Sequence, residues 1–408
     1  MERAQDAAAW RARKGVLGKV SARDFSLVEL NFAPDAVLIT RMKISLLGLA
    51  LALGLAALAE PAFDWNRARE IHARETRGEK IATEERAVLD EAIRRRKAGE
   101  AVTGNQAAPP SATRPALHFT PLTEMKDKYQ DQDGGLYGGG RNEPPAAHAA
   151  LAAKAIAQMQ PLNAEGKPAA DGKIVLLSMG MSNTTMEFST FLPKASADPR
   201  KAANVVVVDG AQGGKDATAW AAAEAAPWKV AEERLRAAHA TPQQVQAVWI
   251  KQALVQPKKG FPAETERLRD RLRENVTLAK EKYPNLRVAY LSSRIYAGYA
   301  GSNLNPEPYA YESAFAVRWL IQEQMKGSPT LNPDPAQGTV KAPVLLWGPY
   351  LWADGKTPRQ ADGLSYLPED FGGDGTHPSP AAREKVAKLL LDFFTTNPLA
   401  KPWFTTGR

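Results

Sequence analysis

Short runs of apolar residues recur through the second half of the chain and predict buried strands. Five such runs are present, at 174–179, 204–208, 247–253, 287–292 and 343–347. Short, continuous apolar runs bounded by glycine or polar residues are typical of strands that are buried on both faces of a sheet. Helical stretches lie around and between them, at 182–191, 218–240 with a break near Pro227, 265–282, 311–324 and 381–394. This alternation predicts an α/β fold, with a mostly parallel sheet and helices on both faces.

The first strand is followed directly by a candidate nucleophile. Residues 181–185 (MSNTT) are mostly small and polar, and they are suited to capping a helix. In open α/β sheets ligands bind beyond the carboxyl ends of the strands. Ser182 therefore lies where a nucleophile would be presented, and the free N–H groups of the helix could bind an oxyanion. A plain helix cap is the alternative interpretation of this serine.

A second motif lies near the end of the chain, at 371–380 (FGGDGTHPSP). Asp374 and His377 are three residues apart on a loop that glycine and proline restrict. At this spacing the carboxylate can orient the imidazole, and the imidazole can accept the proton of a serine. We therefore expect Ser182, His377 and Asp374 to form a catalytic triad.

Together, GMSNT at 180–184 and DGTHPS at 374–379 resemble the motifs of the SGNH (GDSL-like) hydrolase superfamily. The form of the first motif is most similar to the carbohydrate acetylesterase branch, which includes sialate O-acetylesterases. The resemblance spans roughly residues 173–394. It implies a flavodoxin-like, three-layer α/β/α sandwich with a five-stranded sheet, and a serine esterase activity.

The resemblance also implies donors for an oxyanion. In the superfamily a glycine after the second strand donates its N–H, and Gly213 or Gly214 is placed to do so; a simple strand-to-helix turn is the alternative. Residues 249–252 (WIKQ) resemble the Trp-x-Gln-Gly-Glu motif of the carbohydrate esterase branch, with one extra residue and without the final Gly-Glu. Gln252 is the expected side-chain donor to the oxyanion. An asparagine of the loop at 301–305 is the alternative donor.

Three more side chains are expected to bind substrate. Asn183 follows the nucleophile, while Arg294 and Tyr296 follow the fourth strand. Arg294 could clamp an anionic or hydroxylated sugar, and a tyrosine could stack on the sugar ring. A structural salt bridge is the more common role of such an arginine. A glycine-rich stretch at 134–142 is either a surface loop or part of the pocket wall.

The N-terminal part of the chain has the pattern of an exported protein. A basic flank at 41–43 precedes the apolar run 44–59, which ends in Ala-Leu-Ala before Glu60. This pattern predicts a signal peptide at 42–59, with residues 1–41 as an upstream extension of the reading frame. An uncleaved anchor is the alternative. The rest is expected to comprise a charged helical extension (60–97), a linker and loop-rich prelude (98–171), the hydrolase-like domain (172–396) and a C-terminal tail (397–408).

Composition narrows the classes of function. The net charge of +8 comes from 53 basic and 45 acidic residues that are interspersed, so no nucleic-acid partner is expected. The chain has no cysteine, which excludes disulfides and thiolate chemistry, and its five histidines lack the spacing of metal ligands. We expect neither a metal nor another cofactor. The oligomeric state is left open.

These patterns lead to one main hypothesis. We expect a secreted or periplasmic serine ester hydrolase that removes acetyl groups from an O-acetylated carbohydrate. Its substrate would be a small-molecule or polysaccharide ester, with no stable membrane insertion after signal cleavage. The alternatives are a catalytically inactive domain of the same fold that binds a glycan or a protein, and an acyltransferase that uses a sugar hydroxyl as acceptor.

The signal-peptide prediction can be tested directly. If residues 42–59 are a cleaved signal peptide, the exported protein begins at Glu60. N-terminal sequencing or intact mass measurement of the exported chain shows where it begins. A mature chain that still contains 44–59 would favour the anchor instead.

Overall fold

The computed structural model describes residues 63–65, 67–68, 71, 74, 80–97 and 117–406. The chain divides into two units, residues 1–104 and 105–408. The segments expected as an upstream extension (1–41) and as a signal peptide (42–59), and residues 98–116 of the expected linker, lie outside the described residues.

In the first unit, the charged extension forms helix α3, Thr83–Lys97. Trp65, Ala68 and Ala92 form a small buried cluster, and Phe63 and Val88 pack against it. Although the extension is highly charged, its few apolar side chains therefore bury one another in this cluster.

The second unit is built on one sheet of five strands in the order β2-β1-β3-β4-β5. Every pairing between neighbours is parallel, which confirms the predicted fold class. The strands are β1 Ile174–Gly180, β2 Val205–Val208, β3 Val245–Lys251, β4 Val288–Ser292 and β5 Val344–Trp347. All residues of β1, β3, β4 and β5 are buried, as their mostly apolar sequences predict.

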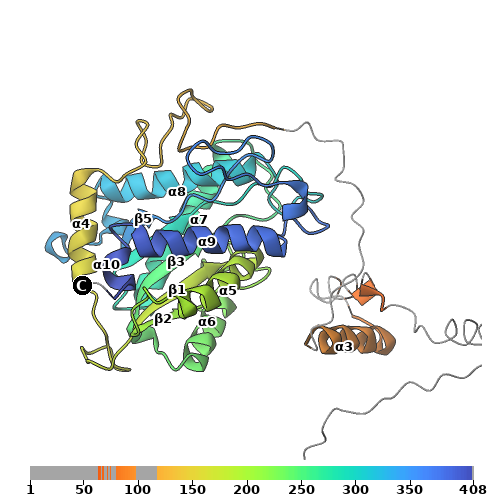
Figure 1. The fold of residues 1–408 in the computed structure, drawn as a ribbon, viewed down its shortest axis with the longest axis horizontal. Helices are drawn as coiled ribbons and strands as arrows, with labels where there is room; N and C mark the ends of the chain where they lie inside the picture. Colours follow the sequence, from red (N-terminus) through yellow and green to blue (C-terminus); the bar gives the residue numbers. More distant parts are fainter. Residues whose placement is uncertain are drawn as a thin grey trace, which may run out of the picture. The chain divides into compact units, whose positions relative to one another are not determined.

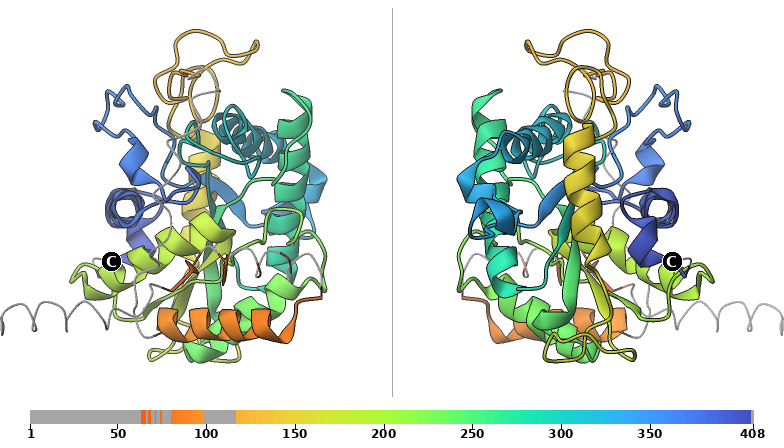
Figure 2. Two further views of the ribbon diagram at one scale, coloured as in Figure 1. Left: turned by 90° about the vertical axis from the view of Figure 1, so that its right-hand side faces the viewer. Right: turned by 90° about the vertical axis from the view of Figure 1, so that its left-hand side faces the viewer.

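Helices cover both faces of this sheet (Figures 1 and 2). Helices α5, Ser182–Ala197, and α9, Pro380–Thr396, pack together on one face. Helices α7, Ala263–Lys282, and α8, Tyr309–Met325, pack together on the other face. Helix α6, Ala226–Ala237, lies against the end of α7 through the ring contact of Trp228 with Tyr283. Short 3-10 helices occur at Pro242–Gln244, Pro329–Leu331, Pro335–Gln337 and Pro368–Asp370.

Three elements differ from the sequence prediction. Helix α6 begins at Ala226, so that Pro227 stands in its first turn, where the missing N–H costs nothing, rather than breaking a longer helix. The expected loop-rich prelude contains helix α4, Ala146–Ala157, which packs beside β5. The expected C-terminal tail contains a short helix, α10, Lys401–Phe404, whose aromatic residues pack against α9.

The glycine-rich stretch at 134–142 makes contacts that support the fold. Tyr137 is buried, and its hydroxyl accepts the N–H of Trp347 at 3.4 Å. The side chain of Gln322 on α8 donates to the Tyr137 carbonyl at 3.0 Å. The stretch therefore joins α8 to β5, which favours the structural interpretation of these glycines.

The register of the sheet determines which side chains can meet. Gly180 at the end of β1 is paired with Lys251 at the end of β3, and Lys251 is paired with Ser292 at the end of β4. The segments that follow these strands therefore begin side by side at one edge of the sheet. Among the described residues, no helix is both long enough and apolar enough to span a membrane.

Candidate active site

Three side chains from two distant parts of the chain meet at the carboxyl edge of the sheet. Ser182 is the first residue of α5, and its Oγ lies 2.8 Å from Nε2 of His377. On the other side of the ring, Nδ1 of His377 contacts Oδ2 of Asp374. A carboxylate can only accept, so Nδ1–H is the donor in that contact. Nε2 is then left to accept the hydroxyl proton of Ser182.

Several donors hold the Asp374 carboxylate. The backbone N–H groups of Thr376 and His377 each donate to its Oδ1 at 3.0 Å. Burial alone would raise the pKa of this carboxyl, but the ring and the backbone donors outweigh burial and lower the pKa well below its usual range. Asp374 is therefore ionised at neutral pH. The stability that its ionised form contributes is lost only as the pH falls through the lowered pKa.

The loop that carries these residues has little freedom. The N–H of Gly372 donates to the carbonyl of His377 at 2.8 Å, which closes the loop on itself. Gly375 has a φ of 62°, and a Cβ at this position would lie 1.8 Å from the carbonyl oxygen of Tyr299. Only glycine fits there, so the loop keeps the conformation that directs the imidazole at the serine.

Asn183 holds this loop against α5, although the sequence suggested a contact with substrate. Its side chain is buried, and Nδ2 donates to the carbonyl oxygen of Thr376 at 3.0 Å. The amide that would bind substrate is thus already used by the protein. An asparagine next to Ser182 therefore has a structural role. Its contact ties the first turn of α5 to Thr376, the residue before His377.

The two glycines expected to donate to an oxyanion are accessible. Gly213 and Gly214 are exposed, and a Cβ on either would meet no atom within 4 Å. Within the described part of the chain, neither N–H takes part in a hydrogen bond. Gly214 has a φ of 71°, which glycine adopts without strain. Both N–H groups are therefore available to a ligand.

Gln252 is the amide that the fold leaves unused. It is buried directly beyond β3, and neither its Nε2 nor its Oε1 has a hydrogen-bond partner among the described residues. The alternative asparagines are already engaged: Asn303 Nδ2 donates to Pro257 O at 3.3 Å, and Asn305 Nδ2 donates to Leu254 O at 3.1 Å. A buried amide without a partner is costly, which favours Gln252 over the asparagines as a ligand donor.

A cluster that the sequence analysis did not identify anchors the glycine turn after β2. The hydroxyl of Ser178 in β1 donates to Asp209 at 2.6 Å, and Thr185 in α5 donates to the same carboxylate. The N–H of Gln212 donates to the carbonyl of Gly180 at 3.0 Å. These contacts hold the glycine turn next to the start of α5. The sequence feature that could have indicated this cluster is an aspartate directly after an apolar strand.

A second missed feature is an ion pair between α5 and β3. Lys251, the last residue of β3, pairs with Glu187 on α5, and both side chains are fully buried. Burial raises the pKa of Glu187 and lowers that of Lys251 to about 8, while each charge opposes the shift of the other. Thr184 also donates to the Lys251 carbonyl at 2.7 Å. The sequence feature that could have indicated this ion pair is a lysine at the end of an apolar strand.

Arg294 and Tyr296 are both buried after β4. The guanidinium of Arg294 forms neither a hydrogen bond nor an ion pair with any described residue, so the structural salt bridge that the sequence left open is absent there. Tyr296 packs edge-on against Tyr299 and Trp352. Burial raises the pKa of Tyr296. These aromatic neighbours account for the burial of the Tyr296 ring, and its stacking on a sugar stays a prediction.

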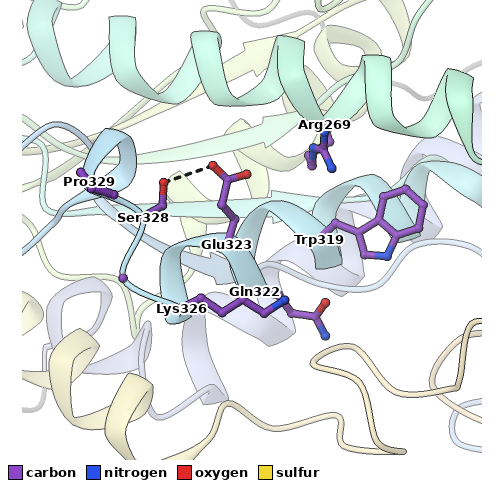
Figure 3. A pocket seen from close by; sticks show the side chains of 8 residues that line it. Arg269, Trp319, Gln322, Glu323, Lys326, Ser328 and Pro329 are labelled. Carbon is purple, nitrogen blue, oxygen red and sulfur yellow. Dashed lines mark hydrogen bonds between the residues drawn. The ribbon is translucent and has the colours of Figure 1, made fainter.

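A separate hollow lies away from the triad, between α7 and the end of α8 (Figure 3). Its volume is about 470 Å³, and Ser328 donates to Glu323 within it at 3.2 Å. Its lining residues are Arg269, Trp319, Gln322, Glu323, Lys326, Gly327, Ser328 and Pro329. None of them belongs to the triad. Across the described ranges, no group of three or more histidine, aspartate or glutamate side chains could hold a metal ion.

The buried ion pair generates a prediction about stability. Replacing Lys251 with Met leaves the Glu187 carboxylate buried and unpaired, so the free energy of unfolding should fall by about 3–5 kcal/mol. Replacing both residues, as Glu187→Leu with Lys251→Met, removes both charges and should restore most of that loss. Denaturant unfolding of the three proteins measures both effects. A single variant as stable as the parent would show that the pair does not hold α5 to β3.

No protein-family model and no curated protein matches the chain. Solved structures do resemble it. A Bacteroides fragilis protein described as an acylhydrolase is 14% identical, covers 61% of this chain and 97% of its own, and has a TM-score of 0.32. An acetyl-xylooligosaccharide esterase from Geobacillus is 15% identical over 54% of this chain and 93% of its own, with a TM-score of 0.31.

A third similar structure is the periplasmic domain of a Salmonella lipopolysaccharide acetyltransferase. It is 13% identical, covers 55% of this chain and 83% of its own, and has a TM-score of 0.29. At these scores the likeness does not decide what this chain does. Any proposal about its chemistry rests on the sheet topology and on the contacts of Ser182, His377 and Asp374.

Proposed function

We propose that this protein is a serine hydrolase of acyl esters, with Ser182 as nucleophile, His377 as general base and acid, and Asp374 as the group that orients the imidazole. One observation carries the proposal. Ser182 Oγ and His377 Nε2 are 195 residues apart in sequence and 2.8 Å apart in space, with a carboxylate at the other ring nitrogen. This arrangement is what nucleophilic catalysis by a serine requires.

The reaction follows from these positions. Ser182 Oγ attacks the ester carbonyl carbon while His377 Nε2 accepts the hydroxyl proton. Asp374 stabilises the resulting imidazolium through Nδ1–H. His377 then donates the proton to the departing alcohol oxygen, and an acyl-enzyme remains. Water attacks the acyl carbonyl carbon as His377 takes its proton, and the return of that proton to Ser182 releases the acid.

The charge that develops on the carbonyl oxygen needs donors. We assign them to the N–H of Ser182 in the first turn of α5, to the N–H of Gly213 or Gly214, and to the side chain of Gln252. Two observations support this set: the glycine N–H groups are free, and the Gln252 amide is buried without a partner in the described structure. Preorganised donors of this kind act where the substrate excludes water.

The finer assignment is an acetylesterase that acts on an O-acetylated carbohydrate after export. Its support is the sequence resemblance of the GMSNT and DGTHPS motifs and the signal-like segment at 42–59. The contacts of Ser182 with His377 and of His377 with Asp374 favour an enzyme over an inactive binding domain. Binding alone does not need a serine, a histidine and an aspartate in consecutive contact. Whether water or a sugar hydroxyl accepts the acyl group depends on what reaches His377, whose side chain is 30% exposed.

The role of the nucleophile can be tested with an activated acetyl ester such as 4-nitrophenyl acetate. Ser182→Ala should lower kcat by about 10⁴-fold or more, because neither the nucleophile nor its hydrogen bond to His377 remains. Ser189→Ala, an exposed serine on the same helix, is the matched control and should keep the parental rate. Equal turnover by Ser182→Ala and the parent, or none in either, contradicts the proposal.

The side-chain donor can be tested separately. Gln252→Ala should lower kcat by about 10²–10³-fold, the usual effect of losing one oxyanion donor. Asn303→Ala is the control, because its amide is used by a backbone carbonyl, and it should stay within a few-fold of the parent. Undiminished turnover by Gln252→Ala would remove Gln252 from the oxyanion site.

A further inference from the structure

Arg294 is a buried cation that the fold leaves without a partner. It stands two residues beyond β4, and its side chain is only 1% exposed. Nε is fully enclosed and has no hydrogen-bond partner. The terminal nitrogens also donate no hydrogen bond to any described residue, but they are not among the fully enclosed atoms. The end of the guanidinium is therefore the part that an incoming group can reach.

The other buried arginines of the described structure provide a comparison, because in each of them the guanidinium is hydrogen-bonded within the protein. Arg318 is 2% exposed and donates to Asp133 O at 2.6 Å and to Gln132 Oε1 at 3.0 Å. Arg359 is 6% exposed and donates to Tyr350 O at 2.7 Å, and it also pairs with Asp362. Arg294 is at least as buried as both, and it alone lacks such bonds.

Each carboxylate that influences Arg294 is committed elsewhere. Glu187 is paired with Lys251, and Asp374 contacts His377. Glu307 accepts hydrogen bonds from the N–H groups of Tyr311 at 2.9 Å and Ala297 at 3.0 Å, and from the Trp352 indole at 2.8 Å. These three carboxylates favour the charged form of Arg294, while its burial lowers the pKa.

An arginine stays protonated even so, and a buried charge without a partner destabilises a fold. This destabilising charge stands just beyond β4, at the carboxyl edge of the sheet, where a bound ligand could pair with it.

The position of Arg294 indicates which part of a substrate would meet it. The segment that it begins reaches the loop of His377, because the N–H of Gly301 donates to the carbonyl of Asp374 at 3.0 Å, so it stands on the His377 side of Ser182. His377 returns the proton to the departing alcohol, and the alcohol part of the ester is therefore the part that faces this side. A guanidinium presents a planar fork of donors, which matches a carboxylate in two parallel hydrogen bonds.

We propose that Arg294 binds a carboxylate on the alcohol part of the substrate, so that the enzyme acts on acetyl esters of acidic, uronate-type sugars. This inference rests on the proposed esterase function and adds the substrate class. Arg294 has the role of a specificity-determining residue. The carboxylate of the substrate forms the hydrogen bonds that the guanidinium does not form within the protein. A neutral sugar leaves the guanidinium unpaired.

The test compares two substrates that differ only at C6, which carries a carboxylate in one and a neutral hydroxymethyl group in the other: the methyl glycoside of an O-acetylated glucuronic acid, and the methyl glucoside acetylated at the same position. The full-length protein should have a kcat/KM at least about tenfold higher for the acidic ester, the usual effect of a hydrogen bond to a charged group. In Arg294→Gln this ratio should fall to about 1, and Arg294→Lys should recover part of it. Arg318→Gln is the matched control, and it should lower the melting temperature but keep the parental ratio.

A second measurement needs no variant. Free glucuronate should inhibit hydrolysis of 4-nitrophenyl acetate by the parent protein at concentrations at least about tenfold lower than glucose does. This readout applies even if Arg294→Gln does not fold.

The outcomes separate this inference from the proposed function. Hydrolysis of 4-nitrophenyl acetate that depends on Ser182, together with equal rates on the two sugars, overturns the role of Arg294 and leaves the esterase in place. A ratio that Arg294→Gln preserves, or equal inhibition by glucuronate and glucose, has the same meaning. If 4-nitrophenyl acetate hydrolysis does not depend on Ser182, the esterase assignment fails first, and the substrate class fails with it.

Discussion

The parallel pairing of β1 with β3 is the constraint on which the site depends. It places the end of β1, where α5 and Ser182 begin, beside the end of β3. Parallel strands present their carboxyl ends at the same edge of the sheet, so residues that follow different strands come close together there. The Glu187 to Lys251 ion pair then joins the helix of the nucleophile to the neighbouring strand.

The second requirement is that the last loop of the domain reaches back to the first helix. Helix α9 packs against α5 on the same face of the sheet, which brings the residues just before α9 over the start of α5 (Figure 1). Asn183 and the glycine turn at 375 then set the loop conformation. The imidazole is therefore positioned by packing and backbone hydrogen bonds that belong to the fold, and a ligand is not needed to assemble it.

Polar groups buried near the site fall into two kinds. Some are satisfied by the protein, such as Asp209 with its two hydroxyl donors and Glu307 with its three donors. Others, namely Gln252 and Arg294, are buried without a partner in the described structure. Unsatisfied buried groups are rare in proteins because desolvation is costly, so the location of these two just beyond β3 and β4, at the carboxyl edge of the sheet, is informative.

The sequence by itself determined the class of fold, and it predicted that Ser182, His377 and Asp374, which the structure brings into contact, would lie together. Apolar runs specify buried strands locally, and the short spacing of Asp374 and His377 makes their contact a local matter. It did not determine that Asn183 would be used by the loop, that Tyr296 would be enclosed, or that Arg294 would lack a partner. Burial and hydrogen bonding of a side chain depend on residues far away in the chain. Only the tertiary structure brings those residues together.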